Sequence, residues 1–168
     1  MALTRQQIET YLREVGAELE GRSLRGEILI VGGAFMALVL RARTTTKDVD
    51  AVVTSDPEPM REAVAQVARR HSLPAEWLND AVKGFIYKKP PTRLWAEYPG
   101  LRVYVPATDY VFAMKAHAAR PEDRTDLLTL RDTLGLRDAE EAIRIVERYV
   151  PANRRRIQTQ LTIESLFE

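Results

Sequence analysis

Two acidic residues separated by one position, Asp48 and Asp50, are the side chains of this sequence best suited to chemistry. Residues two positions apart in a strand point to the same face, so the two carboxylates would lie side by side. Carboxylates that close repel each other, and one of them takes up a proton unless a cation keeps both ionised. Magnesium meets this need, because it binds one or two carboxylates together with phosphate oxygens of a substrate. The pair therefore predicts an Mg²⁺ site.

A pair of glycines, Gly32 and Gly33, stands upstream of the acids, between an apolar run and a second apolar segment. Without a Cβ, both positions let a phosphate approach the backbone, and the start of the following helix favours its negative charge. A phosphate cradle beside a magnesium pair is the minimal equipment for phosphoryl or nucleotidyl transfer. The Gly-Lys-Ser/Thr of a Walker loop does not follow the glycines. The alternative for the glycines is a tight turn without function.

Three further residues accompany the acidic pair in the run Arg43-Thr44-Thr45-Thr46-Lys47-Asp48-Val49-Asp50. Arg43, Thr46 and Lys47 are candidates for contacts with the phosphates of a nucleotide, and the two cations could instead pair with the carboxylates. The alternatives are a plain surface loop for the cations and an exposed sheet edge for Asp48 and Asp50.

Apolar spacing predicts the elements that position these residues. A capped amphipathic helix is expected first, followed by alternating short strands and helices, and then by a purely helical half. The expected helices are 4–20, 34–40, 56–71, 108–119, 123–134, 138–149 and 153–167, and the expected strands are 27–31, 48–53 and 101–105. Residues 72–100 appear irregular apart from a possible strand at 85–87. The predicted fold class is α/β (α+β), a small mixed sheet flanked by helices.

Length, charge and cysteine content exclude several classes of protein. The chain has 168 residues, 45% of them hydrophobic and 29% charged, a formal charge of +1 and no cysteine. This predicts one compact unit, with a core at 1–107 and a helical region at 108–168 packed on it. The absence of cysteine excludes disulfide scaffolds, thiolate zinc sites, iron–sulfur clusters and cysteine nucleophiles. The near-neutral charge excludes a strongly basic nucleic-acid binder. No targeting segment or membrane span is visible, so the expected location is the cytoplasm.

Taken together, the glycine pair, the buried helix after it and Arg-x-x-Thr-x-Asp-hydrophobic-Asp resemble the active-site signature of the DNA polymerase β-like nucleotidyltransferases. The chain is most similar to their minimal bacterial branch, which includes the AbiEii and MenT toxin-type nucleotidyltransferases and small uncharacterised relatives. The segments Ala75–Asp80 and Met114–Asp126 also resemble this branch. The resemblance runs from about residue 25 to residue 150.

The resemblance implies a nucleotidyltransferase fold and a Mg²⁺-dependent transfer of NMP from an NTP to a hydroxyl of RNA, such as tRNA, or of protein. Gly32 and Gly33 would sit under the triphosphate, and Asp48 and Asp50 would hold Mg²⁺. Lys115 would neutralise phosphate charge, while Asp126 or Asp123 would complete the polar site or orient Lys115. A toxin of this kind would have a cognate antitoxin protein as its partner.

Related enzymes commonly carry a third carboxylate on a later strand, and the expected strand 101–105 has none. Either Asp109, Asp123 or Asp126 takes its place, or the protein is a catalytically reduced module that binds a nucleotide or a partner. A small-molecule adenylyltransferase of the antibiotic-modifying type is a further alternative. Lys115 could also be a surface lysine, and Asp123 and Asp126 could be helix caps.

Outside this set, Trp77, Asn79 and Asp80 could contact a base or ribose, with a core position as the alternative for the tryptophan. Two basic clusters, 88–93 and 154–156, would be the contacts for an RNA acceptor, or else solvated surface.

Overall fold

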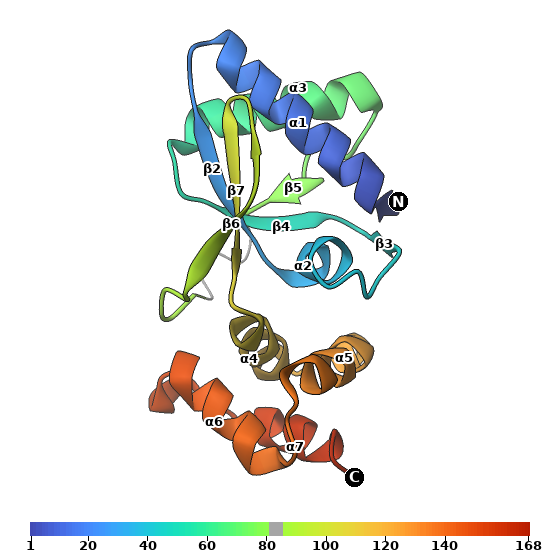
Figure 1. The fold of residues 1–168 in the computed structure, drawn as a ribbon, viewed down its shortest axis with the longest axis vertical. Helices are drawn as coiled ribbons and strands as arrows, with labels where there is room; N and C mark the ends of the chain where they lie inside the picture. The colour runs from blue at the N-terminus through green and yellow to red at the C-terminus, as the bar shows by residue number, and fades with distance from the viewer. Residues whose placement is uncertain (81–85) are drawn as a thin grey trace. The chain divides into compact units, whose positions relative to one another are not determined.

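Helices and strands alternate in the first part of the chain, and helices alone make up its last part (Figure 1). The computed structural model describes residues 1–80 and 86–168. These residues form two compact units, which are considered separately below. Of the described residues, the first unit comprises 1–80 and 92–105, and the second comprises 86–91 and 106–168. The prediction that residues 108–168 pack on residues 1–107 stays a prediction.

A five-stranded mixed sheet forms the centre of the first unit. Its strand order is β5-β4-β2-β7-β6, with β2 antiparallel to β4 and parallel to β7, and β4 parallel to β5. The strands are β2 (Gly26–Ile30), β4 (Val49–Val53), β5 (Leu78–Asn79), β6 (Thr92–Tyr98) and β7 (Leu101–Pro106). A separate antiparallel pair joins β1 (Leu3–Thr4) to β3 (Thr45–Thr46). The mixed α/β class expected from the sequence is confirmed.

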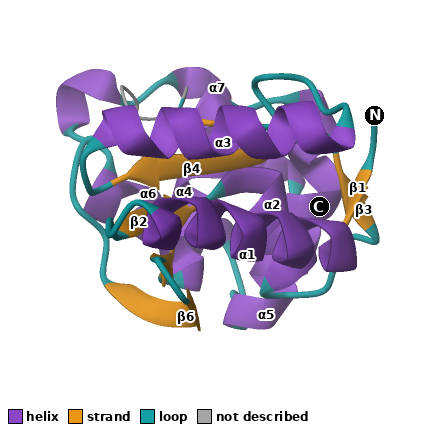
Figure 2. Cartoon of the chain, turned by 90° about the horizontal axis from the view of Figure 1, so that it is seen from above, coloured by secondary structure: helices purple, strands orange, loops and turns teal. Residues whose placement is uncertain are grey.

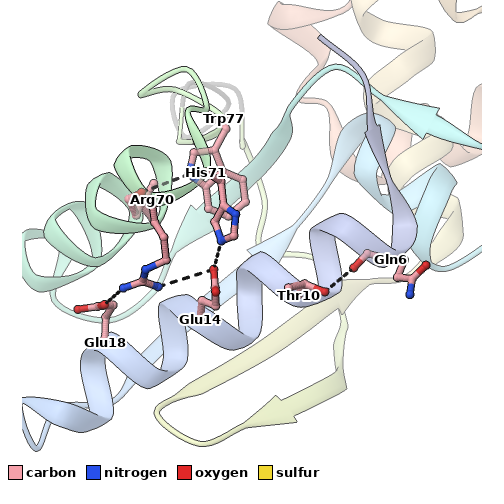
Figure 3. Close-up of polar contacts among 8 residues, drawn as sticks. Gln6, Thr10, Glu14, Glu18, Arg70, His71 and Trp77 are labelled. Carbon is pink, nitrogen blue, oxygen red and sulfur yellow. Dashed lines mark hydrogen bonds and ion pairs between the residues drawn. The ribbon is translucent and has the colours of Figure 1, made fainter.

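Two long helices, α1 (Arg5–Gly21) and α3 (Pro57–His71), lie side by side over the sheet (Figure 2). Thr4 and Gln7 close the predicted capping box at the start of α1, and Asp56 caps α3. Figure 3 shows polar contacts that link the two helices. His71 Nε2 lies 2.5 Å from Glu14 Oε2, and Arg70 Nη2 lies 2.5 Å from Glu18 Oε1.

The helix α1 approaches the turn between β6 and β7 through Gly16. A Cβ on Gly16 would lie 2.4 Å from the carbonyl oxygen of Pro99 and 3.2 Å from Cβ of Leu101. Glycine is a poor residue for a helix interior, so its presence here reflects the close packing of helix on hairpin rather than helix stability.

The second unit is built around α4 (Thr108–Ala118), which contacts the three α-helices that follow it. A helix with apolar residues on every side is expected to be buried, and Tyr110, Phe112 and Ala116 are all buried. The other elements are η2 (Pro121–Asp123), α5 (Arg124–Leu134), α6 (Ala139–Tyr149), η3 (Ala152–Arg154) and α7 (Ile157–Ser165). No helix in residues 1–80 and 86–168 has the length and apolar character needed to cross a membrane.

Most of the predicted elements form within two residues of their expected ends. Helix α2 (Gly32–Leu38) begins on the glycines themselves, and α7 begins at Ile157, after a 3-10 turn, rather than at 153. The stretch 72–100, expected to be irregular, contains β5 and β6. The possible strand at 85–87 begins in residues 81–85, which lie outside the described residues, and Ile86 and Tyr87 belong to no strand.

We expect Gly16→Ala to destabilise the protein although alanine favours helices. The methyl group would overlap the carbonyl of Pro99, which belongs to the backbone and cannot rotate away, so the cost should be about 1–3 kcal/mol. The control is Gly21→Ala in the same helix, because a Cβ on Gly21 meets no atom within 4 Å. Urea denaturation of both variants measures the difference, and a Gly16→Ala protein as stable as Gly21→Ala would contradict it.

Candidate functional site

The pairing of β2 with β4 brings the glycine turn to the acidic pair. In an antiparallel pair the end of one strand lies beside the start of the other. Ile30 is opposite Ala51, and the backbone N–H of Val31 donates to the carbonyl of Asp50 at 2.9 Å. The residues that follow Val31 therefore reach the beginning of β4, where Asp48 and Asp50 stand.

Gly32 and Gly33 pack directly against side chains that the sequence singled out. A Cβ on Gly32 would lie 2.9 Å from Oδ2 of Asp50, and the φ of +65° at Gly32 is one that favours glycine. A Cβ on Gly33 would lie 2.8 Å from Oγ1 of Thr46 and 3.1 Å from Nη1 of Arg43. Both glycines therefore lie close to polar side chains, and at Gly32 the backbone conformation also favours glycine.

Asp48 joins this cluster through its backbone. The hydroxyl of Thr46 donates to the carbonyl oxygen of Asp48 at 3.2 Å, and Asp48 directly precedes β4. Asp48 and Asp50 are both half-buried, so solvent reaches each of them. Lys47 is exposed, and in the described part of the chain no hydrogen bond or ion pair connects it to this cluster.

The contribution of the glycines is steric. Helix α2 starts at Gly32 and has 7 residues, so its dipole is short, and its first turn contains no acidic residue. The backbone of Gly32 and Gly33, which carries no side chains, lies next to a carboxylate, a hydroxyl and a guanidinium group. The space that a side chain would take at each glycine is filled by Asp50, Thr46 and Arg43, so the approach of a phosphate to this backbone stays a prediction.

The strand next to Asp50 on its other side is β5, which the sequence analysis did not predict. Asn79 of β5 is the register partner of Asp50 in a parallel pair, so the two side chains stand on the same face of the sheet. The amide nitrogen of Asn79 donates to the carbonyl of Glu76 at 3.2 Å. The strand expected to carry a third carboxylate, β7, is separated from β4 by β2. The third position beside the acidic pair is therefore held by an amide.

This position could have been found from the chain order. A strand, a helix of 15 residues and a second strand favour a right-handed crossover that sets the strands parallel. Applied to β4 and α3, the rule points to residues 78–79. Trp77, directly before them, is only 1% exposed and donates through Nε1 to the carbonyl of Val64 at 3.2 Å. Its ring meets Tyr11 edge-on at 5.6 Å, so Trp77 belongs to the core.

The donor set at the acidic pair suits a hard cation. Two carboxylates two positions apart and an amide in register with one of them supply oxygen ligands of the kind that Mg²⁺ binds. Substrate phosphates would complete the coordination, as is usual for this ion. No group of three or more acidic, histidine or cysteine side chains suited to a metal occurs in residues 1–80 and 86–168.

The second unit contains a buried ionic cluster made of Lys115, Asp123 and Asp126. Lys115 Nζ lies 2.7 Å from Oδ1 of Asp123 and 2.9 Å from Oδ2 of Asp126. All three residues are buried, with 8%, 8% and 3% of their surfaces exposed. The sequence resemblance placed these residues together, and the structure does so through α4, η2 and the first turn of α5. Their role toward a nucleotide stays a prediction.

The alternatives for this cluster are not supported. A surface lysine would expose its ammonium group, whereas Lys115 is buried. Asp123 stands at the N-cap position of α5, but its side chain accepts no capping hydrogen bond. Asp109, another candidate for the third carboxylate, accepts from the hydroxyl of Tyr149 at 2.8 Å and pairs with Arg148. Its carboxylate is therefore occupied by contacts between α4 and α6.

One of the two basic clusters is largely structural. Arg155 donates from Nε to the carbonyl of Val150 at 2.9 Å, and Arg156 donates to the carbonyl of His117. These carbonyls lie at the ends of α6 and α4, where backbone oxygens need partners. Arg154, Lys88 and Lys89 are exposed. Contacts of the basic clusters with RNA stay a prediction.

A cavity of about 630 Å³ lies at the opposite end of the sheet from the glycine turn. It is lined by the start of β2, the end of α1 and the β6–β7 turn, and none of the residues predicted from the sequence lines it. Its charged walls include Glu97 and Arg102, which pair with each other at 3.1 Å. The candidate site therefore rests on the glycine turn and the acidic pair, not on this cavity.

Comparisons of the chain with protein-family models, curated proteins and solved structures find no match. What the site can do must therefore be argued from its own geometry.

We expect Lys115→Met to destabilise the protein by about 3–5 kcal/mol, because it leaves two buried carboxylates without their cation. Lys89→Met is the matched control, since Lys89 is exposed and should cost at most about 0.5 kcal/mol. Thermal and urea unfolding, followed by circular dichroism, measure both. Equal stability of the two variants would show that the ionic cluster does not support the fold.

Proposed function

We propose that the protein is a Mg²⁺-dependent nucleotidyltransferase, which transfers NMP from an NTP to a hydroxyl of RNA or protein. The observation that carries the proposal is the contact of the Gly32–Gly33 turn with Asp50, Thr46 and Arg43. The backbone of the turn, one carboxylate of the acidic pair, a hydroxyl and a guanidinium meet there. Phosphoryl and nucleotidyl transfer need little else, because catalysis rests on positioning and on neutralising charge.

In this proposal each residue has a separate task. Asp48 and Asp50 hold Mg²⁺, which supplies positive charge to the phosphate oxygens when it is bound. Gly32 and Gly33 receive the triphosphate against the main chain, and Arg43 and Thr46 donate hydrogen bonds to it. The acceptor oxygen forms a bond to the α-phosphorus while the bond to the bridging oxygen of pyrophosphate breaks. The proton of the acceptor hydroxyl passes to water, because an amide stands where a third carboxylate would act as base.

The test is incubation of the purified protein with each α-labelled NTP, Mg²⁺, and either total RNA or cell extract. We expect one class of macromolecule to become labelled and pyrophosphate to be released. Asp48→Asn and Asp50→Asn should each lower transfer at least about a thousandfold, because either change removes half of the negative charge at the cation. Asp132→Asn, which alters a carboxylate 68% exposed, is the control and should retain full transfer.

Circular dichroism must show that both site variants remain folded. Transfer that survives in Asp48→Asn and in Asp50→Asn would contradict the proposal.

A second candidate function is a catalytically reduced module that binds a nucleotide without turning it over. The position of Asn79 beside Asp50 favours it, since an amide can bind a cation or a ribose but cannot accept a proton. Calorimetry with NTP and Mg²⁺ separates the two functions: a module binds NTP and releases no pyrophosphate.

We expect Asn79→Asp to raise the rate of transfer, because it places a base next to the acidic pair. General bases contribute about 100-fold or more to such reactions, so an increase of at least about tenfold is expected. The measurement is the rate of pyrophosphate release at saturating NTP, with Asn79→Ala as the comparison. A rate that falls in both variants would mean that the amide itself is needed, for instance to hold the nucleotide.

A further inference from the structure

The strand β6 is the outermost strand of the sheet on one side, and in residues 1–80 and 86–168 no strand pairs with its outer edge. Figure 2 shows it at the margin of the sheet, on the side away from β4. β6 has 7 residues and exposes Thr92, Arg93 and Leu94, the last with 46% of its surface. A long exposed edge offers unpaired N–H and C=O groups to another strand, and proteins usually protect such edges.

The outward backbone groups of β6 follow from its hairpin with β7. The strands end at Tyr98 and begin again at Leu101, so a two-residue turn joins them. In such a hairpin the residues next to the turn exchange both hydrogen bonds, and every second residue does so along the ladder. Tyr98, Ala96 and Leu94 thus point their backbone groups toward β7. The groups of Arg93, Trp95 and Glu97 point outward.

The side chains of these three residues share one face with a row of charges that alternate in sign. Arg102 of β7 lies 3.1 Å from Glu97 of β6 and 3.9 Å from Glu27 of β2. The row across the three strands therefore reads Glu27, Arg102, Glu97. It ends on a negative charge at the open edge, where the next strand would be favoured if it placed a cation opposite Glu97.

β6 itself contains such a cation, Arg93, four residues before Glu97. If two copies of β6 pair antiparallel about a two-fold axis at Trp95, Arg93 of each copy faces Glu97 of the other. Trp95 then faces Trp95, and Arg93, Trp95 and Glu97 form the hydrogen-bonded pairs, as their outward groups require. Moving the centre to Leu94 or Ala96 places Arg93 opposite Trp95 or Pro99 and loses the charge match. Arg93 is exposed and has no ion pair within the described part of the chain.

We propose that the edge of β6 binds a second copy of this chain, forming a symmetric dimer in which two five-stranded sheets join into one. The interface is isologous, since the same patch serves both copies. Its specificity comes from the reciprocal Arg93–Glu97 pairs, which extend the charge row of each sheet across the two-fold axis. This proposal does not depend on the proposed nucleotidyl transfer, because it uses no residue of the glycine turn or the acidic pair.

Charge exchange at the two positions tests the register. In Arg93→Glu both facing positions are acidic, and in Glu97→Arg both are basic, so each variant alone should dimerise at least about tenfold more weakly than the wild type. An equimolar mixture of the two variants faces acid with base at both contacts, and it should form dimers again. Arg61→Glu on α3 makes the same change of charge at an exposed site away from β6 and should leave dimerisation unchanged.

Sedimentation velocity over a range of protein concentrations measures the dimer, whose mass is twice 19.1 kDa, and circular dichroism verifies that each variant is folded. Because Glu97 also pairs with Arg102, Glu97→Lys replaces Glu97→Arg if the arginine variant does not fold. A wild-type chain that stays monomeric at every concentration overturns the proposal. So does a dimer that Arg93→Glu leaves as strong as the wild type, or a mixture of folded variants that does not associate.

Discussion

The antiparallel register of β2 with β4 determines the geometry of the candidate site. Because β2 runs into the glycines and β4 begins at the acids, pairing them in opposite directions puts both features at one end of the sheet. The hydrogen bond from Val31 to the carbonyl of Asp50 fixes this end. A parallel arrangement of the same two strands would separate the glycines from the acids by the length of a strand. The close approach of Gly32 to Asp50 is thus a consequence of strand direction.

Strand order then determines what stands beside the acids. The crossover through α3 places β5 next to β4, so an amide, Asn79, is in register with Asp50. β7, whose exposed face carries Arg102 and Tyr104, is aligned with β2 instead. A carboxylate and an amide differ little in shape but much in chemistry, because only the carboxylate accepts a proton at neutral pH. If the site binds a cation as proposed, Asn79 can contribute an oxygen ligand but cannot act as a base.

Burial separates the ionic cluster of the second unit from the ion pairs on the surface. Lys115 and its two carboxylates are buried, whereas the pairs of Arg70 with Glu14 and Glu18 are partly exposed. Exposed pairs contribute little to stability, while a buried charge that loses its partner is costly. The ionic cluster therefore stabilises the contact of α4 with α5, while the ion pairs of Arg70 add little to the stability of the contact between α1 and α3.

Local patterns in the sequence predicted most of the helices, the central strands and the residue types of the candidate site. Apolar spacing, the cap at Thr4 and the acids at 48 and 50 are properties of neighbouring residues, so they can be read without knowing the fold. The pairing of segments that are distant in the chain could not be predicted from such local patterns. The strands β5 and β6 are stabilised by neighbours far along the chain or across a turn, and β5 has only two residues. Likewise, Asp123 stands at the sequence position of a helix cap, but in the folded chain its carboxylate pairs with Lys115. A buried ammonium group without a partner would be costly, and the sequence alone does not show that Lys115 is buried.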